Sequence, residues 1–330
     1  MAKPFTRRTV CVAALLGSTF LFGTGSAQAQ PGAYPDKPIR MVLGFPPGGP
    51  TDIVARILGQ KMSEALGQPV VVDNKPGVAG NIAAEMIARA SADGYTILYN
   101  TSSITISPWV YQKVNFDPLK DFAPVALTAE MPLVLLANPS VQANTTAELV
   151  QKIKAATGKY NYGSSGTGAI EHLTSAQFVF SQGLQVTHIP YKGTAPALTD
   201  LIAGQTQFML TTMNTAIPYV KDGRLRALGV TSLKRAPALP NVPTLAEAMK
   251  TDFASTAWQG IVVPAGTPAD IVAKLNKVVN EVLKDPAVVQ KLADQGVATL
   301  GGTPEQYKAF IQKEYARWQG VVKDSGAKSQ

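Results

Sequence analysis

Two glycine-rich loops hold the residue types best suited to chemistry. The first, "FPPGGPTD" (Phe45–Asp52), follows an aliphatic run and precedes a segment with helical spacing. Strand, glycine loop and helix N-terminus in this order often bind an anion, because glycine lets backbone N–H groups approach closely and the helix dipole attracts negative charge. Neither a Walker lysine nor a G-x-G-x-x-G pattern is present. We therefore expect ligand contacts from Phe45, Pro47, Gly48, Gly49, Thr51 and Asp52.

The second loop lies in "NYGSSGTGAIEHL" (Asn161–Leu173), where a strand again ends in small residues before a helix. Hydroxyl groups and glycines alternate in it, which gives hydrogen-bond donors together with close backbone approach. We expect ligand contacts from Ser164, Ser165, Gly166, Thr167, Gly168 and His172. Taken singly, each loop fits ordinary turns and helix caps better than a binding site. Two comparable loops in one chain favour binding.

Three shorter stretches are predicted to face the same cleft. They are "SSIT" (Ser102–Thr105), "YKGTAP" (Tyr191–Pro196) and "TTMNTA" (Thr211–Ala216). Each follows a predicted strand, and open α/β sheets bind ligands beside the carboxyl ends of their strands. From these stretches Ser102, Ser103, Tyr191 and Asn214 are candidate binding residues.

Catalytic patterns are weak in this sequence. Gly163–Thr167 lacks the final glycine of a G-x-S-x-G nucleophile elbow. A hydrolase that uses Ser165 as nucleophile and His172 as base stays open as an alternative, although a carboxylate must orient the histidine. His188 lies in an apolar strand and is typical of a core residue. We assign no catalytic residue and predict that the protein is not an enzyme.

Metal and cofactor sites are not expected. The sequence has two histidines and one cysteine, Cys11, and it has neither HExxH nor calcium-loop spacing. Lys192 is a possible Schiff-base residue, but an exposed loop lysine explains it as well. Asp52 is a possible general base or an ordinary acid in the first turn of a helix.

The elements that must position these loops alternate along the chain between strand-like and helix-like patterns. This succession predicts an α/β fold with mostly parallel sheets covered on both faces. The segment "TSSITISP" (Thr101–Pro108) is expected to be a loop. The predicted strands are Ile39–Phe45, Val70–Val72, Gly94–Asn100, Tyr160–Tyr162, Val186–Tyr191, Gln207–Thr211 and Leu225–Thr231, and the predicted helices are Asp52–Leu66, Asn81–Ala90, Ala147–Ala156, Ile170–Phe180 and Pro196–Ala203.

Two apolar runs are expected to cross between two domains. They are Phe122–Pro139 and Trp258–Pro268, with hinges near Leu133–Ala137 and Ile261–Pro264. These crossings divide the chain into a discontinuous first domain, residues 30–137 plus 258–330, and a second domain, residues 138–257. Two such domains that face each other leave a ligand cleft between them.

The N-terminus has the pattern of a secretory signal peptide. Lys3, Arg7 and Arg8 precede a short apolar stretch, and Ala27–Ala29 reads as an A-x-A cleavage site. Cleavage after Ala29 leaves 301 residues, lowers the net charge from +8 to +5 and removes the cysteine. The scattered positive charge favours attraction to small acids over nucleic acid, and no later segment is apolar enough to span a bilayer.

The order of the motifs resembles one family over nearly the whole chain after the leader. The motifs include "PIRMVLGFPPGGPTDIVAR", "VVVDNKPGVAGNIAA", "YGSSGTGAIEHL", "IPYKGTAPALTDLIAGQTQFM" and "WQGIVVPAGTP". The chain resembles the periplasmic solute receptors of tripartite tricarboxylate transporters, the Bug family. The resemblance implies a two-domain venus-flytrap fold of type II. It further implies a monomeric periplasmic protein that binds a small carboxylate and delivers it to membrane permease subunits, without a cofactor.

The resemblance also implies roles for individual residues. The loops Pro47–Asp52 and Ser164–Gly168 would hold one ligand carboxylate, and Asn81 would support the first loop. Phe45 and Tyr191 are predicted to pack against the carbon skeleton of the ligand. Two departures stand out: Ala79 replaces a family glycine, where a positive φ is unfavourable for alanine, and Ala169 replaces a common serine. A secreted serine hydrolase, or a ligand sensor for a membrane signalling protein, is the alternative function.

Overall fold

The computed structural model describes Met1 and residues 34–327, and Tyr34–Gln330 form one compact unit. The predicted signal peptide and its cleavage site lie outside the described residues. Ten strands form one continuous mixed sheet in the order β2-β1-β3-β9-β4-β7-β5-β6, and β10 and β8 also pair with β4. The strands are β1 Ile39–Leu43, β2 Val70–Asn74, β3 Thr96–Thr101, β4 Phe122–Ala137, β5 Asn161–Ser164, β6 Thr187–Pro190, β7 Phe208–Thr212, β8 Arg226–Val230, β9 Thr256–Pro264 and β10 Ala298–Thr299.

The sheet has two regions that share the long strand β4. In the first region β1 pairs in parallel with β2 and β3, and β9 lies antiparallel between β3 and β4. In the second region β5 pairs in parallel with β6 and β7, and β4 runs antiparallel to β7 and β8. Parallel pairing is thus found in the βα units, in four of the nine strand pairs of the described residues, and the five antiparallel pairs all involve β4 or β9. The sheet is therefore mixed, not mostly parallel as was expected.

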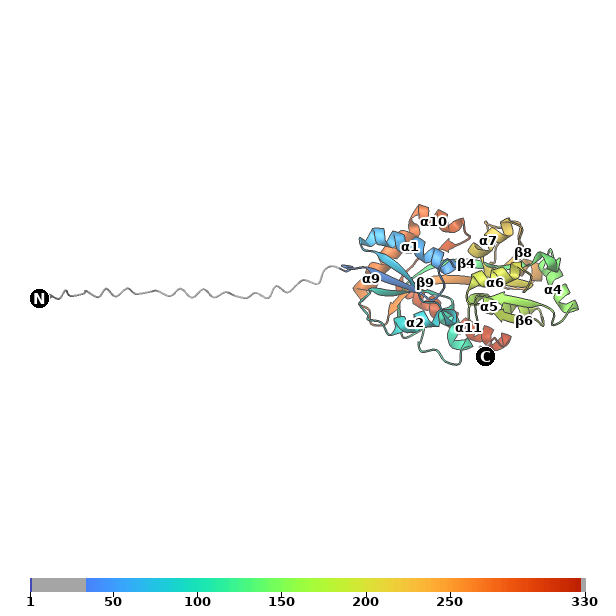
Figure 1. The fold of residues 1–330 in the computed structure, drawn as a ribbon, viewed down its shortest axis with the longest axis horizontal. Helices are drawn as coiled ribbons and strands as arrows, with labels where there is room; N and C mark the ends of the chain where they lie inside the picture. The colour runs from blue at the N-terminus through green and yellow to red at the C-terminus, as the bar shows by residue number, and fades with distance from the viewer. Residues whose placement is uncertain (2–33, 328–330) are drawn as a thin grey trace. The chain divides into compact units, whose positions relative to one another are not determined.

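Each region is covered by its own helices (Figure 1). Helix α1 packs against β2 and against α9, whereas α5 packs against β7 and α6 against β5. The helices with at least eight residues are α1 Pro50–Leu66, α2 Asn81–Ala88, α3 Ser103–Val110, α4 Thr146–Ala155, α5 Ile170–Ser181, α6 Thr194–Ile202, α7 Met213–Lys221, α9 Ala269–Lys284, α10 Pro286–Ala293 and α11 Pro304–Ser325; α8, Leu245–Met249, is shorter. No helix in the described part of the chain is long and apolar enough to cross a membrane.

The register shows where the chain passes from one region to the other. Strand β4 pairs with β9 as far as Pro132 and with β7 from Leu133 onward. On the return, Ser255 donates to the Thr231 carbonyl in the second region, and Thr256 pairs with Pro132 in the first. The hinges predicted at Leu133–Ala137 and Ile261–Pro264 were therefore placed a few residues inside the two regions. The partner change occurs at 132/133 and 255/256.

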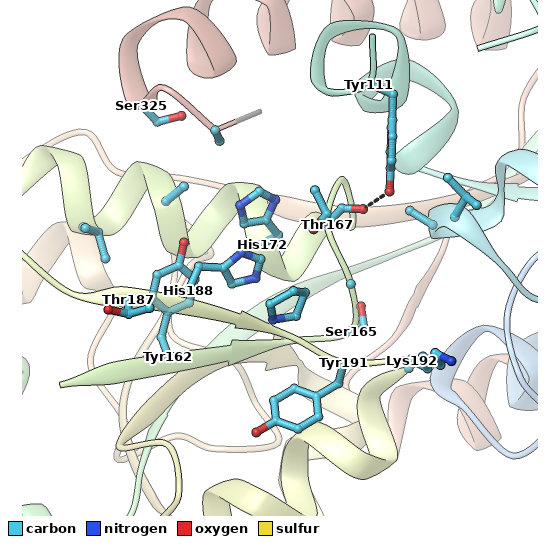
Figure 2. A pocket seen from close by; sticks show the side chains of 18 of the residues that line it. Tyr111, Tyr162, Ser165, Thr167, His172, Thr187, His188, Tyr191, Lys192 and Ser325 are labelled. Atoms are coloured by element: carbon cyan, nitrogen blue, oxygen red, sulfur yellow. Dashed lines mark hydrogen bonds between the residues drawn. The ribbon is translucent and has the colours of Figure 1, made fainter. Parts of the chain in front are cut away.

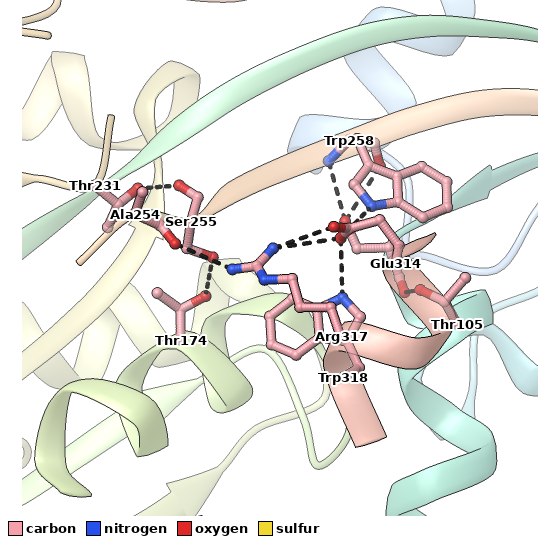
Figure 3. A network of polar contacts seen from close by, with 10 residues as sticks. Thr105, Thr174, Thr231, Ala254, Ser255, Trp258, Glu314, Arg317 and Trp318 are labelled. Atoms are coloured by element: carbon pink, nitrogen blue, oxygen red, sulfur yellow. Dashed lines mark hydrogen bonds and ion pairs between the residues drawn. The ribbon is translucent and has the colours of Figure 1, made fainter. Parts of the chain in front are cut away.

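A polar network fixes the return crossing (Figure 3). The buried carboxylate of Glu314 on α11 accepts the indole N–H groups of Trp258 and Trp318, each at 3.1 Å. Arg317, one turn along, contacts Glu314 and donates to the Ala254 carbonyl at 3.0 Å. Because α11 also packs against α5 of the second region, this helix holds the crossing segment from the outside.

Two segments that were read as loops begin helices. "TSSITISP" was predicted as a loop, but Ser103–Val110 form α3 with Pro108 inside it. A proline lacks a backbone N–H and tends to break a helix. Pro108 is the sixth of the eight residues of α3, so only the end of the helix follows it. "TTMNTA" likewise ends β7 and starts α7, with Pro218 again sixth in the helix.

Candidate functional site

A partly open cavity of about 130 Å³, the inner cavity, lies where the two glycine-rich loops meet. It has roughly ten times the volume that one buried water needs. Gly49, Pro50 and Thr51 line it from the first loop and Ser165 from the second. Further lining residues are Phe45, Pro47, Gly48, Thr101, Ser102, Ser103, Ile170, Glu171, Lys192, Gly193, Thr194, Ala195, Pro196, Thr212, Ala257, Trp258 and Gln259.

Five helices begin at this cavity. The N-cap residue or the first residue of α1, α3, α5, α6 and α7 lines it in each case: Gly49, Ser102, Ile170, Gly193 and Thr212. None of these five helix starts has a side-chain cap. Because the first N–H groups of a helix have no acceptor within it and carry partial positive charge, the cavity wall is suited to an anion.

Asp52 holds the first loop in shape. Its carboxylate accepts the Gly48 N–H at 2.9 Å, the Arg56 guanidinium at 2.8 Å and the Asn74 amide at 2.9 Å. Burial alone would raise the pKa of Asp52, but the three hydrogen bonds outweigh it and hold the pKa below its usual value. Asp52 is outside the cavity lining and supports the loop, and its contact with a ligand stays a prediction.

The loop before α2 approaches the first loop closely. A Cβ on Gly44 would lie 2.3 Å from the Cα of Gly80, so the two backbones touch. Ala79 has φ +52. It therefore adopts the left-handed conformation that is unfavourable for alanine. Asn81 starts α2 and lines a separate cavity of about 20 Å³ with Phe45 and other residues. Its support of the first loop stays a prediction.

The second loop is organised by Glu171, which the sequence did not single out. The Ser165 hydroxyl donates to the Glu171 carboxylate at 2.7 Å. His172 instead accepts the Gly168 N–H on Nδ1 at 3.2 Å, and the buried Ser164 hydroxyl lies 2.7 Å from Nε2 of His188. The Ser165–His172 pair that a hydrolase needs is therefore not formed, because each of the two side chains has another partner.

A larger outer groove, about 1410 Å³, adjoins the inner cavity (Figure 2). Phe45, Ser165 and Lys192 line both. In the groove the rings of His172 and His188 stack at 4.0 Å between centroids, and Tyr162 stacks on His188 at 4.9 Å. Burial lowers the pKa of His172 to about 3 and that of His188 to about 4. Both rings are therefore neutral at neutral pH and form an uncharged wall.

Two contacts join loops of the two sheet regions. The Tyr111 hydroxyl donates to the Thr167 carbonyl, as the dashed line in Figure 2 marks. On the other side of the inner cavity, the Asn214 amide donates to the Pro50 carbonyl at 3.4 Å. Gly168 allows the first contact, because a Cβ there would lie 2.7 Å from the Tyr111 ring.

The structure sorts the predicted binding residues into three groups. Those on the inner cavity are Phe45, Pro47, Gly48, Gly49, Thr51, Ser102, Ser103 and Ser165. Gly166, Thr167, His172 and Tyr191 line the outer groove only. Asp52, Asn81, Ser164, Gly168 and Asn214 line neither. Tyr191 turns its hydroxyl to Asp200 at 2.7 Å.

Sequence reasoning missed several residues of the inner cavity. Gly193 and Thr194 were inside a stretch predicted to face the cleft, and their place before a helix was the signal that could have identified them. Trp258 and Gln259 were read only as part of a buried strand. Glu171 has the position of an ordinary first-turn acid, and only the structure shows that it is 4% exposed.

Comparison with known proteins decides the family. Residues 54–327 match the model of the tripartite tricarboxylate transporter family receptor, TctC. The chain belongs to this family. The periplasmic binding protein BugD is 35% identical, with a TM-score of 0.85 over 90% of this chain and all of BugD.

Two further relatives of this TctC-family chain have solved structures with acids bound. R. palustris Rpa4515 with adipate is 35% identical, with a TM-score of 0.86 over 89% of this chain and 98% of that one. MatC from Rhodopseudomonas palustris with bound malate is 33% identical, with a TM-score of 0.82 over 88% of this chain and all of MatC. The TctC-family chain thus has the two-domain periplasmic-binding-protein fold of type II.

Proposed function

We propose that this protein is a periplasmic receptor that binds a small carboxylate in the inner cavity and delivers it to the permease of a tripartite tricarboxylate transporter. The observation that carries the proposal is the convergence of five helix N-termini without a side-chain N-cap on one cavity. Backbone N–H groups at such sites favour an anion of any kind. The adipate and malate bound to Rpa4515 and MatC support a carboxylate in particular.

The expected affinity follows from few interactions. A hydrogen bond to a charged group contributes about 1.5–3 kcal/mol net, and micromolar binding needs about 8 kcal/mol. Three or four N–H or hydroxyl contacts are therefore sufficient without an arginine. Lys192 is the one basic residue of the described lining, and the net charge of the chain after the proposed cleavage, +5, adds long-range attraction for an acid.

Binding is coupled in this proposal to closure of the two domains about the crossings at 132/133 and 255/256. Short segments that absorb a change in backbone angles are the usual hinges of such proteins. The domain limits stay as predicted from sequence, residues 30–137 plus 258–330 and residues 138–257. We also propose export through a signal peptide that is cleaved after Ala29, and a monomeric state.

Thermal unfolding against a panel of acids tests the proposal. The panel contains malate, adipate, succinate, citrate, benzoate and several amino acids, with inorganic phosphate as the control anion. Ligand at a hundred times its Kd adds about 2.7 kcal/mol to the free energy of unfolding, so we expect one class of carboxylate to raise the Tm by several degrees. A rise with phosphate alone, or no rise with any acid, would contradict the proposed function.

A further inference from the structure

The two glycine-rich loops are closed in the same way. Gly48 and Gly168 both have a positive φ, +76 and +81, and each lies two residues before the start of a helix. In each case the backbone N–H of the glycine donates to the side chain four residues later, to Asp52 Oδ2 at 2.9 Å and to His172 Nδ1 at 3.2 Å. His172 therefore has the same place in the second loop that Asp52 has in the first.

This closure differs from a helix N-cap. Asp52 and His172 are each the third residue of their helix, α1 and α5. An N-cap side chain accepts an N–H group of the first turn and so occupies it, whereas these two side chains reach back to an N–H group that precedes the helix. The loop is thereby fixed without the use of a first-turn N–H group. Such a support fits a site in which a ligand needs the first-turn N–H groups.

His188 holds the other end of the second loop. The buried hydroxyl of Ser164 lies 2.7 Å from His188 Nε2 and 3.3 Å from the Gly166 carbonyl, and it accepts the Gly166 N–H at 3.2 Å. A hydroxyl has one proton, and the shorter contact favours its donation to His188. The stacked imidazole rings, 4.0 Å apart between centroids, thus each accept one hydrogen bond from an end of the loop.

The second loop carries the contacts that binding and closure need (Figure 2). Ser165 lines the inner cavity, and the Thr167 carbonyl accepts the hydroxyl of Tyr111 from the other sheet region. Both residues lie between Ser164 and Gly168, which are the two residues that the histidines hold. Because only three residues separate these ends, a shift of either end would move Ser165 and Thr167 together.

We propose that His172 and His188 are positioning residues that fix the ends of the second loop, each through one acceptor nitrogen, and that the two rings are in opposite tautomers. An Nδ1 that accepts the Gly168 N–H leaves the proton of His172 on Nε2, and an Nε2 that accepts the Ser164 hydroxyl leaves the proton of His188 on Nδ1. The effect on ligand affinity rests on the proposed function, whereas the tautomers and the loop contacts do not. The alternative role is packing alone, in which the rings matter and their nitrogen atoms do not.

Nitrogen spectra of the imidazole rings test the tautomers in the wild-type protein without a ligand. Long-range proton–nitrogen correlation separates a protonated ring nitrogen from an unprotonated one. The sequence has two histidines, so the signals that are lost in His188→Gln assign both rings. We expect the Nε2–H tautomer for His172 and the Nδ1–H tautomer for His188. The same tautomer in both rings, or a rapid mixture of tautomers in either ring, would overturn the proposal.

Two variants of His172 separate the acceptor from the ring. Asparagine places an amide oxygen near the position of Nδ1 and removes the ring, whereas phenylalanine keeps a ring and removes the acceptor. In His172→Phe we expect faster solvent exchange of the Gly168 amide and about three- to tenfold weaker binding of adipate or L-malate, because one neutral hydrogen bond contributes that much. His172→Asn should stay close to the wild type in both measurements.

Tyr162→Phe is the matched control, because Tyr162 belongs to the same stack and the hydrogen bonds from the loop to His172 and His188 remain. It should change neither the Gly168 exchange nor the affinity. A larger effect of His172→Asn than of His172→Phe would overturn the proposal in favour of packing. Failure of the wild type to bind any acid of the panel would overturn the proposed function and not this inference, since exchange and tautomers are measured without ligand. The wild-type tautomers decide the question if a His172 variant does not fold.

Discussion

Helices that begin at the inner cavity differ from helices that begin on the outer surface. Of the six helices that begin away from the inner cavity, α4, α8, α10 and α11 start with a side-chain cap, from Thr145, Thr244, Asp285 and Thr303, whereas α2 and α9 start without one. The five helices at the cavity have none, and Gly49, Ala169 and Gly193 occupy three of their N-cap positions. Four of these six helices thus cap an N–H group with a side chain from the N-cap residue, and none of the five cavity helices does. At the cavity the Ser103 N–H donates to the Thr101 hydroxyl at 3.3 Å and the Glu171 N–H bonds its own carboxylate, so the N–H groups open to a ligand are mainly those of the other helices.

The difference teaches where this fold gives up stability for binding. A side-chain N-cap contributes about 1 kcal/mol, so five missing caps leave several kcal/mol to be recovered when an anion binds. A bound carboxylate can act as a shared cap for more than one helix. On this view an added cap at the cavity must weaken binding, and a lost cap at the surface must weaken only the fold.

The largest effect is expected from a cap installed at the cavity. Gly49 has φ −78 and ψ 170, a conformation that suits an N-cap aspartate. In Gly49→Asp the new carboxylate occupies the N–H groups of α1 and repels an acid, so we expect binding at least ~100-fold weaker, about 3 kcal/mol. The free protein should be a few tenths of a kcal/mol more stable.

Titration calorimetry with the best acid of the panel measures the loss of binding in Gly49→Asp. Gly49→Asn is the matched control, since it caps the helix without a charge and should lose less affinity. Unchanged affinity in both variants would mean that α1 does not bind the ligand.

Acid should destabilise the cavity side through the stacked histidines. His172 and His188 are neutral in the folded protein, with pKa values of about 3 and about 4, whereas unfolded histidine has a pKa near 6.5. The unfolded state therefore binds more protons below pH 6.5, and stability falls as the pH drops toward 4. From pH 6 to pH 5 we expect a loss of about 2 kcal/mol from the pair.

Urea unfolding at several pH values measures this dependence. His188→Gln removes one titrating group, so its stability should fall less steeply than that of the wild type over the same interval. Identical slopes in the two proteins would show that His188 does not contribute, whatever the absolute stabilities are.

Removal of a side-chain N-cap away from the cavity is expected to have the opposite effect, a loss of stability without a loss of ligand affinity. Thr303 accepts the Gln306 N–H at 3.2 Å and forms a capping box at the start of α11. Thr303→Ala should lower the free energy of unfolding by about 1 kcal/mol and leave ligand affinity unchanged. Thr145→Ala at α4 repeats the test at an independent helix. A change in affinity in either variant would break the contrast between the two groups of helices.

The smallest effect is expected at the contact between the sheet regions. Tyr111→Phe removes the hydroxyl that donates to the Thr167 carbonyl, a loss of about 0.5–1.5 kcal/mol. Since the contact joins loops of the two regions, affinity for the acid should fall about three- to tenfold with little change in the free protein. Equal losses of stability and affinity would indicate that the contact is already formed without ligand and does not favour closure.

Much of the fold could be predicted from sequence because the strand and helix patterns are strong and local. The helix predicted to start at Ile170 begins there as α5. The predicted strand Gln207–Thr211 differs by one residue from β7, Phe208–Thr212. α3 was missed, because Pro108 reads as a helix breaker although it lies where the helix has almost ended. The hinges were misplaced because the change of partner within β4 leaves no mark in an uninterrupted apolar run.

The loops of the site could be predicted, but not the roles within them. The sequence pattern of strand, glycine-rich loop and helix identified Gly49 and Ser165, which line the inner cavity. It could not separate them from Asp52, which supports the loop, or from Ser164, which turns to His188, because neighbouring residues point in different directions. Glu171 was passed over because its partners, Ser165 in the preceding loop and Thr194 at the start of α6, come together with it only in the fold.

Backbone amide shifts during a ligand titration test the central claim most directly. Two-dimensional proton–nitrogen spectra of the protein would be recorded with increasing amounts of the acid that gives the largest rise in Tm. We expect the largest downfield shifts at the first-turn amides of the cavity helices, including Thr51 and Thr194, and none at the starts of α4 and α11. Shifts that gather at Tyr162 and His188 in the outer groove, with the first-turn amides unmoved, would contradict the account.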